Sequence, residues 1–245
     1  MTIRTTLFTS SLIAASLISG AAHATLIGRD LNGSAGSFEA YYDTDLNITW
    51  LANANVNGLM TWSAANTWAA NLSFTNGINV YDNWRLPTVN PVNGSSLNYG
   101  LSYNGSTDYG YNVSEQGTAF AGSTGSEMAH LFYNTLNNKG ICDPALSTVS
   151  FCSGPQAGRG LTNRGPFTNL QADSYWSAPE YAPFTNEAWG FDFSGSGFQG
   201  SVTKNADLYA LAVSPGDVAA VPEAESWAML LAGLGLIGVA VARRR

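Results

Sequence analysis

Apolar segments at both ends of this 245-residue chain confine any folded domain to the residues between them. In the first segment, the early charge Arg4 precedes an apolar stretch, and an Ala-His-Ala triplet ends at Ala24. A charged start, an apolar centre and a small-x-small cleavage site are typical of a secretory signal peptide. We therefore predict a signal peptide over residues 1–24, cut after Ala24, and export of the rest of the chain.

The second apolar segment runs from Trp227 to Ala242 and is followed by Arg243, Arg244 and Arg245. As a helix it would span roughly 24 Å at ~1.5 Å per residue, less than the ~30 Å of a hydrocarbon core. Trp227 suits one membrane interface, and the arginines suit the cytoplasmic one. The pattern predicts a short transmembrane helix in the inner membrane, with the preceding domain outside.

The residues before this helix carry a specific resemblance. Val221, Pro222 and Glu223, an apolar run and terminal arginines together resemble the PEP-CTERM sorting signal of Gram-negative bacteria, although Ala224 stands where the family usually has proline. The resemblance implies that residues 218–245 form a sorting tail for an exosortase, a membrane cysteine protease. It also implies a host that makes exopolysaccharide and biofilm. Cleavage of the tail and its retention as an anchor remain two open outcomes.

The residues between the two ends form an acidic, aromatic-rich segment. From Thr25 to Ala220 there are 15 acidic and 6 basic residues, a net charge of −9. Such a surface repels nucleic acid, which is therefore not an expected partner. Roughly 190 residues are enough for one domain with a sizeable core.

Periodicity predicts an α+β domain. Two helices are expected, one capped by Thr61 with an apolar face that includes Trp62 and Ala65, and one over residues 126–136. Residues 90–118 and 138–172 are expected to be irregular. The predicted strands cover residues 38–42, 48–51, 175–177, 188–193, 198–203 and 208–213.

Several short motifs occur in the order of a second family. They are Trp84-Arg85-Leu86-Pro87, the segment from Ser126 to Leu131, Tyr175-Trp176-Ser177, and a final strand that ends at Val213. In this order they resemble the Lcl C-terminal-domain-like family, and we assign residues 25–217 to such an ectodomain. The resemblance implies a C-type-lectin-like fold, with a twisted, mostly antiparallel sheet, two helices and long loops. It supplies a fold and not a reaction.

Cys142 and Cys152 are the two cysteines of the chain. In an exported protein such a pair favours a disulfide over a metal site. A redox-active pair is the alternative, which the absence of C-x-x-C spacing disfavours.

Three patterns that can mark ligand sites are incomplete in this sequence. Residues 195–200 match G-x-G-x-x-G, but they lie between two predicted strands and so favour a hairpin. Asp43, Asp45 and Asn47 begin like an EF-hand loop but lack its glycine and closing glutamate, which favours a solvated turn, with a calcium site of another geometry as the alternative. Glu127 and His130 have helical metal-site spacing, but His130 is the only histidine beyond the signal peptide. We predict no metal site and no cofactor.

A lone histidine also argues against serine or cysteine hydrolase chemistry. Carboxylate pairs of Glu180 with Glu187 or Asp192 leave glycoside hydrolysis as an alternative. Arg85 is expected to be a partly buried scaffold residue that pairs with an acid.

The strongest candidates for binding are four tyrosines in the long irregular segment. They are surrounded by Asn, Gly and Ser, as in antibody paratopes, where tyrosine supplies rigid contact area. The alternative is that they pack the loop onto the domain. The four are Tyr99, Tyr103, Tyr109 and Tyr111.

Taken together, these features predict a non-enzymatic, exported protein of the cell surface or extracellular matrix, sorted by its tail and associated with exopolysaccharide. A lectin-like glycan-binding module is the first alternative, and a polysaccharide hydrolase is the second.

Overall fold

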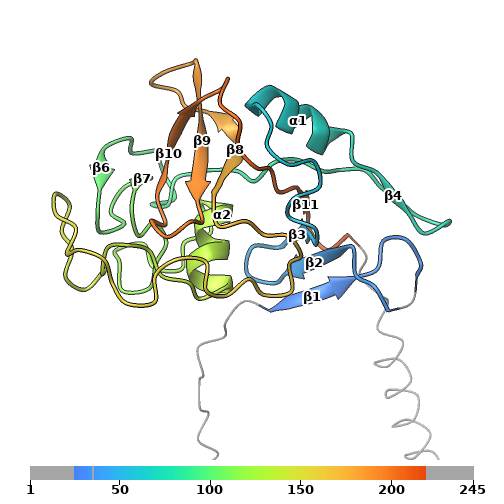
Figure 1. Cartoon of the computed structure of the whole chain (residues 1–245), viewed down its shortest axis with the longest axis horizontal. Coiled ribbons are helices and arrows are strands. Elements are labelled where there is room, and N and C mark those ends of the chain that lie inside the picture. The colour runs from blue at the N-terminus through green and yellow to red at the C-terminus, as the bar shows by residue number, and fades with distance from the viewer. Residues whose placement is uncertain (1–24, 35, 219–245) are drawn as a thin grey trace, which may run out of the picture.

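Two β-sheets, a short β-ribbon and two helical segments form the α+β domain in the computed structural model, which describes residues 25–34 and 36–218 (Figure 1). The four-stranded sheet has the order β1-β2-β3-β11, and the five-stranded sheet has the order β6-β7-β10-β9-β8. All of their strand pairs are antiparallel except β6 with β7. The strands are β1 Leu26–Arg29, β2 Ala40–Asp43, β3 Ile48–Leu51, β4 Phe74–Thr75, β5 Val80–Tyr81, β6 Leu101–Ser102, β7 Tyr109–Gly110, β8 Ser174–Glu180, β9 Glu187–Asp192, β10 Gln199–Thr203 and β11 Val213–Pro215.

The four-stranded sheet brings the two ends of the described chain together. β3 is buried along its whole length and pairs with β2 on one side and β11 on the other, where Val213 lies opposite Trp50. Next to this sheet, Arg29 binds Asp217 with two side-chain hydrogen bonds of 2.6 Å. This Arg29–Asp217 clamp joins the first strand to the residues that follow the last strand.

The five-stranded sheet is built around the β9–β10 hairpin. Its register pairs Gln199 with Phe191 and Thr203 with Glu187. Aromatic side chains of β9 and of the residue that follows it pack against Phe132 of the second helical segment. Phe193 meets the Phe132 ring edge to face at 5.5 Å, and Phe191 lies tilted to it at 5.4 Å between ring centroids. Such contacts stabilise beyond the apolar area that they bury.

The first helix, α1 Trp62–Ala70, begins where the sequence predicts but without the predicted side-chain cap. Thr61 occupies the N-cap position, yet its hydroxyl makes no capping hydrogen bond. The helix is instead fixed by packing of Ala65 and Ala69, which are buried, and by a 3.0 Å hydrogen bond from the Trp62 indole to the Ser177 carbonyl.

The second helical segment divides into two parts. An α-helical turn, α2 Glu127–His130, is capped by Ser126, whose hydroxyl accepts a hydrogen bond from the Ala129 amide, and it continues as the π-helix η1 Leu131–Thr135. The sequence predicted one regular helix over residues 126–136. The position of the helix is confirmed, but the prediction of a single regular α-helix is wrong. Nowhere in residues 25–34 and 36–218 is there a helix with the length and apolarity needed to cross a membrane.

The predictions for the strands are confirmed in part. Strands β2, β3, β8, β9 and β10 lie where they were expected. The strand predicted over residues 208–213 is wrong, because Leu208 and Tyr209 make only isolated bridges and β11 begins at Val213. The expected single sheet is two sheets and a ribbon, and residues 90–118, expected to be irregular, contain β6 and β7.

A central connecting segment, residues 84–89, joins the two sheets to α2. Arg85 exchanges two backbone hydrogen bonds of 2.8 Å with Val213 of β11, and the Pro87 carbonyl accepts one of 2.7 Å from Ala178 of β8. The Arg85 guanidinium binds both carboxylate oxygens of Glu127, at 2.7 and 2.8 Å, and the same carboxylate accepts from the Thr88 amide at 2.7 Å. The expectation that Arg85 pairs with an acid is confirmed.

Replacing Glu127 with alanine should therefore be strongly destabilising. The change leaves a partly buried guanidinium and the Thr88 amide without their acceptor, which we expect to lower the free energy of unfolding by about 3 kcal/mol. The matched control is Glu180→Ala, which removes an exposed partner of Lys204 and should cost less than about 1 kcal/mol. Equal losses for the two variants in urea titrations would contradict this account.

Candidate functional site

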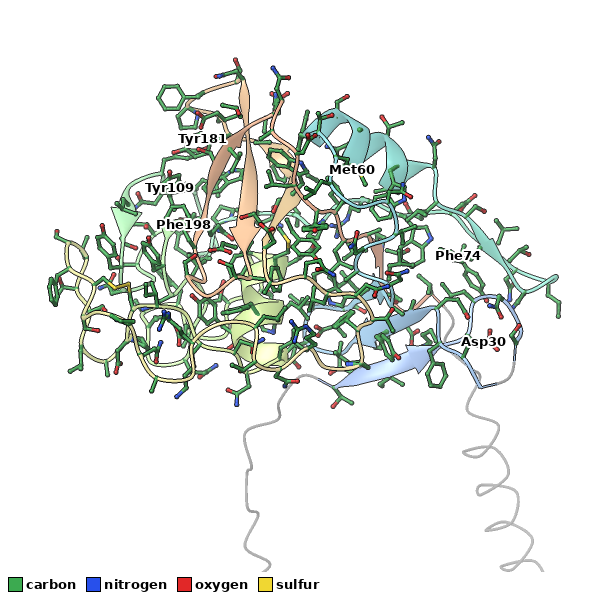
Figure 2. All side chains as sticks on the ribbon, viewed as in Figure 1. Asp30, Met60, Phe74, Tyr109, Tyr181 and Phe198 are labelled. Carbon is green, nitrogen blue, oxygen red and sulfur yellow. A yellow bond between two sulfur atoms is a disulfide. The ribbon has the colours of Figure 1, made fainter. Side chains whose placement is uncertain are left out.

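A group of seven aromatic side chains connects residues 99–111, which we call the tyrosine loop, to the five-stranded sheet. Figure 2 shows three of its members, Tyr109, Tyr181 and Phe198, beside β9 and β10 and on the opposite side of the molecule from Phe74 and Asp30. We call this group the aromatic surface. Its members are Tyr99, Tyr103, Tyr109, Tyr111, Tyr181, Trp189 and Phe198.

One end of the aromatic surface is a pair of stacked rings. Tyr103 and Tyr111 lie nearly parallel, 10° apart, with their centroids separated by 5.2 Å. Phe198 contacts Tyr111 at 4.9 Å and Tyr109 at 5.4 Å, so it links the stacked pair to the rest of the cluster. Tyr103, Tyr111 and Phe198 are all half-buried, which leaves part of each ring accessible to solvent.

The other end of the aromatic surface is anchored on Trp189, whose side chain is fully buried. Tyr99 lies 6.0 Å from the Trp189 ring in a stacked arrangement, and Tyr181 meets it edge to face at 5.0 Å. The structure thus brings all four predicted tyrosines into one cluster, and it packs part of each against the domain. A rigid base below partly exposed rings suits binding, because little side-chain entropy remains to be lost.

The aromatic surface carries no charge of its own. Burial raises the pKa of Tyr111, with a further contribution from the nearby Tyr103 hydroxyl, and burial likewise raises the pKa of Tyr181. Both phenols therefore stay protonated at neutral pH and retain a hydroxyl that can donate or accept a hydrogen bond.

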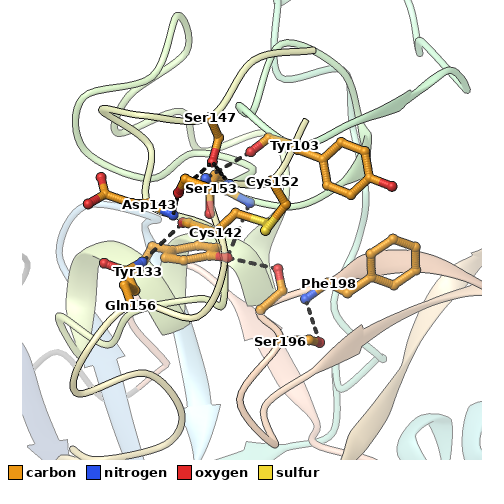
Figure 3. Close-up of a disulfide and its surroundings, with 12 residues drawn as sticks. Tyr103, Tyr133, Cys142, Asp143, Ser147, Cys152, Ser153, Gln156, Ser196 and Phe198 are labelled. Carbon is orange, nitrogen blue, oxygen red and sulfur yellow. Dashed lines mark hydrogen bonds between the residues drawn. A yellow bond between two sulfur atoms is a disulfide. The ribbon is translucent and has the colours of Figure 1, made fainter. Parts of the chain in front are cut away.

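A disulfide-linked loop borders this surface. Cys142 and Cys152 are joined with an S–S distance of 2.12 Å, and Figure 3 shows the bond close to Tyr103 and Phe198. Next to the bond, the Ile141 amide donates to the Ser196 carbonyl at 3.0 Å, which ties the loop to the β9–β10 turn.

The buried Tyr133 hydroxyl connects the same turn to the tyrosine loop. It donates to the Gly197 carbonyl at 2.8 Å and accepts from the Asn112 amide at 3.2 Å. The Asn112 side chain in turn donates to the Tyr103 carbonyl at 3.0 Å. These bonds fix the backbone beneath the stacked tyrosines.

The G-x-G-x-x-G segment is confirmed as part of a hairpin. Residues 193–198 form the turn between β9 and β10, and Gly195 and Gly197 have φ values of 154° and 63°. A side chain on Gly197 would also collide with the Tyr133 hydroxyl. The glycines thus allow the turn to approach Tyr133 closely.

The carboxylates considered for hydrolysis are each held by a neighbour. Glu180 binds Lys204 at 2.6 Å, and Glu187 accepts from the Ser201 hydroxyl at 2.5 Å. Asp192 accepts from the Ser194 amide at 2.6 Å and from the Ser196 hydroxyl. These contacts give all three side chains structural partners.

The EF-hand-like turn was expected to be solvated, and for Asp43 this is wrong. Its carboxylate is fully buried and accepts hydrogen bonds from the Asp45 and Leu46 amides, the Trp50 indole and the Thr135 hydroxyl. It therefore fixes the β2–β3 turn against η1.

The other suspected metal ligands, Glu127 and His130, have different partners. Glu127 is bound by Arg85, whereas the His130 Nδ1 lies 3.1 Å from the Ser123 carbonyl. Across the part of the chain that the structure describes, no three His, Cys, Asp or Glu side chains gather as a metal site.

Three members of the aromatic surface, Tyr181, Trp189 and Phe198, were not among the predicted site residues. Their signal in the sequence is weak, because each occurs singly in a strand or a turn. Only the pairing of β9 with β10, and of β10 with β7, brings them to the tyrosine loop.

Glu115 is a buried carboxyl close to the disulfide loop, only 7 % exposed. Burial raises its pKa to about 8, and the nearby Asp143 adds to the shift, whereas Lys139 opposes it. One of its oxygens, Oε2, has no hydrogen-bond partner among the described residues. The folded state therefore favours the protonated form of this group.

Comparisons with known proteins identify the tail. Residues 220–245 match the PEP-CTERM protein-sorting motif, as the sequence predicted. The chain therefore carries a signal for exosortase-dependent export sorting, with a membrane-anchored tail. No curated protein and no solved structure matches the chain. The predicted signal peptide, residues 1–24, and residues 219–245 of the sorting tail lie outside the described residues.

The raised pKa of Glu115 predicts a specific dependence of stability on pH. A carboxyl whose folded pKa exceeds its unfolded value stabilises the protein fully below the unfolded pKa, and this contribution is lost as pH rises toward 8. The free energy of unfolding should fall between about pH 5 and pH 8. In Glu115→Gln, which cannot ionise, this part of the fall should be absent, giving an advantage on the order of 5 kcal/mol at pH 9.

Urea titrations at pH 5 and pH 9 measure this effect. Glu180→Gln, at an exposed carboxylate, is the control and should keep the wild-type pH dependence. A Glu115→Gln variant with the same pH dependence as the wild type would show that Glu115 is ionised in the folded protein.

Proposed function

We propose that this chain is a non-enzymatic protein of the cell surface or extracellular matrix, and that it binds polysaccharide through the aromatic surface. The observation that carries the proposal is the stacked, half-buried Tyr103–Tyr111 pair on a rigid aromatic base. The flat, apolar faces of sugar rings pack well on such rings, and tyrosine hydroxyls supply hydrogen bonds to sugar hydroxyls. The C-type-lectin-like fold expected from the sequence agrees with this activity and is part of the proposal.

The sorting tail supports the proposed location. An exosortase acts on exported proteins at the inner membrane, and release from the tail delivers the domain to the cell surface or its surroundings. A domain that binds polysaccharide would be retained there by exopolysaccharide and so become associated with a biofilm.

The charges of the domain favour an uncharged polysaccharide. Between Thr25 and Ala220 the net charge is −9, and three of the six basic residues, Arg29, Arg85 and Lys204, already bind carboxylates. A polymer rich in uronic acids or sulfate would be repelled by this surface. We therefore assign the aromatic surface to neutral polysaccharide.

Processing of the tail is tested by intact-mass measurement of protein from a host that carries an exosortase. We expect the mature chain to begin at Thr25 and to end between about Val221 and Trp227. Without the exosortase, or in a Pro222→Ala, Glu223→Ala double variant, the tail should be retained. Full-length protein ending at Arg245 in the exosortase-bearing host would contradict processing and leave membrane anchoring.

Binding is tested with Tyr103→Ala and Tyr111→Ala, which remove the stacked pair. Affinity for the host's neutral exopolysaccharide should fall at least about tenfold, equivalent to ~1.4 kcal/mol, with little change in unfolding temperature. Phe38→Ala, at an exposed ring on the other side of the molecule, is the control. Binding that persists in both tyrosine variants, or a preference for a uronic-acid polymer of equal length, would contradict the proposal.

A further inference from the structure

A concave site lies on the side of the domain opposite the aromatic surface. It is a cavity of about 480 Å³ between the four-stranded sheet and the residues that follow α1. Figure 2 marks its position by Phe74, well separated from Tyr109 and Phe198. Its apolar lining consists mainly of Phe38, Tyr41, Leu51, Val56, Leu72 and Phe74.

The floor of the cavity is fixed by backbone hydrogen bonds. The Thr168 amide donates to the Ala52 carbonyl at 2.9 Å, and the Ala54 amide donates to the Thr168 carbonyl, also at 2.9 Å. Leu51 and Ala52, at the end of β3, are buried. The end of β3 and the loop that contains Thr168 are thus joined across the bottom of the site. These hydrogen bonds oppose collapse of the cavity.

The walls are held by aromatic contacts with the core. Tyr41 packs edge to face on Phe167 at 5.8 Å, and Phe74 packs on Trp84 at 5.5 Å. These partners lie behind the lining residues and keep the two walls apart. The volume therefore belongs to the packed structure, and it falls within the range of about 300–1,000 Å³ that is usual for small-molecule sites.

The rim is accessible and apolar. Phe38 is 54 % exposed and Val56 is 46 % exposed, although both line the cavity. A ligand that covers these side chains would gain free energy from burial of apolar area, at roughly 25 cal/mol per Å².

The polar groups of the lining restrict the charge of the ligand. Glu39 is the only charged lining residue, and both of its oxygens are engaged, by the Leu31 amide at 2.9 Å and by the Asn32 side chain at 2.7 Å. No lysine or arginine lines the site, so an anion would meet a carboxylate and no counter-charge.

Among the polar side chains of the lining, Asn53 is suited to donate a hydrogen bond, as are the hydroxyls of Tyr41 and Ser73. The Asn53 side-chain oxygen, Oδ1, accepts from the Asn55 amide and from the Asn169 side chain, both at 3.1 Å. This arrangement occupies the oxygen, and the Asn53 side-chain nitrogen makes no hydrogen bond within residues 25–34 and 36–218.

We propose that this cavity binds a small uncharged molecule with an apolar body and a hydrogen-bond acceptor that Asn53 contacts. The site is independent of polysaccharide binding, because it shares no residue with the aromatic surface. The domain would then carry a hydrophobic compound together with its polysaccharide-binding surface.

Two dyes with the same ring system test the proposal in protein purified after export. N-phenyl-1-naphthylamine is neutral, whereas 8-anilino-1-naphthalenesulfonate carries a sulfonate. We expect saturable fluorescence enhancement at one site with the neutral dye, and a dissociation constant at least tenfold higher for the anionic one. Absence of saturable binding, or equal affinity for the two dyes, would overturn the proposal.

Cavity-filling variants locate the dye. Val56→Trp and Leu72→Trp fill the site from different walls. Each should raise the dissociation constant of the neutral dye at least tenfold. Val149→Trp is the matched control, since Val149 is 50 % exposed and lies in the disulfide loop. Tyr103→Ala should also leave dye binding unchanged, and a loss in that variant would place the dye on the aromatic surface and refute the cavity.

Urea unfolding followed by far-UV circular dichroism separates filling from misfolding. A filled variant keeps the wild-type far-UV spectrum and a cooperative unfolding transition while dye affinity falls. If both tryptophan variants keep this transition and also keep full affinity, the dye binds elsewhere and the proposal fails.

Discussion

The bond between Arg85 and Glu127 is the point at which the parts of the domain meet. Arg85 belongs to the central connecting segment, residues 84–89, which pairs with β11 of one sheet and β8 of the other. Glu127 begins α2 and also accepts the Thr88 amide. Because one carboxylate serves both a guanidinium and a backbone amide, the helix start, the connecting segment and both sheets are fixed relative to each other. A buried charge is tolerated here since each of its oxygens has a strong donor.

The aromatic surface and the cavity are stabilised by contacts in different parts of the domain. The aromatic surface is carried by β9, β10 and the tyrosine loop, and it is held by the Tyr133 hydroxyl and the disulfide-linked loop. The cavity is carried by β2, β3 and the residues after α1, and it is held by Thr168 and by aromatic contacts. The two sets of supporting contacts share no residue, in line with the two separate binding sites that we propose.

Short sequence patterns predicted the elements that are determined by residues close to one another in the chain. Short runs rich in β-branched and aromatic residues indicated β3 and β9, helical spacing located α1, and Arg85 was expected to pair with an acid. The two-residue strands β4, β5, β6 and β7 have too little periodicity to be detected, and they form because the tertiary structure supplies partners. Residues 208–213 show the opposite case, in which an apolar run was predicted as a strand. Most of this run is buried, but it does not pair as a strand before Val213.

The same limit applies to the sites. The tyrosines of residues 99–111 stand out by composition, and so they were found. Trp189 and Tyr181 join them only through strand pairing between distant segments. The cavity has no motif at all, because its lining comes from β2, β3, the residues that follow α1 and Thr168, and a concave shape is a property of packing.

The Arg29–Asp217 clamp has a mechanical consequence. The sorting motif begins four residues beyond Asp217, a distance of at most about 14 Å in an extended chain. Tension on the tail reaches the clamp before it reaches β11, and Arg29 passes the load into β1 and its neighbour β2. The sheet is therefore loaded across several strands at once, and a pull from the membrane side does not peel its last strand away alone.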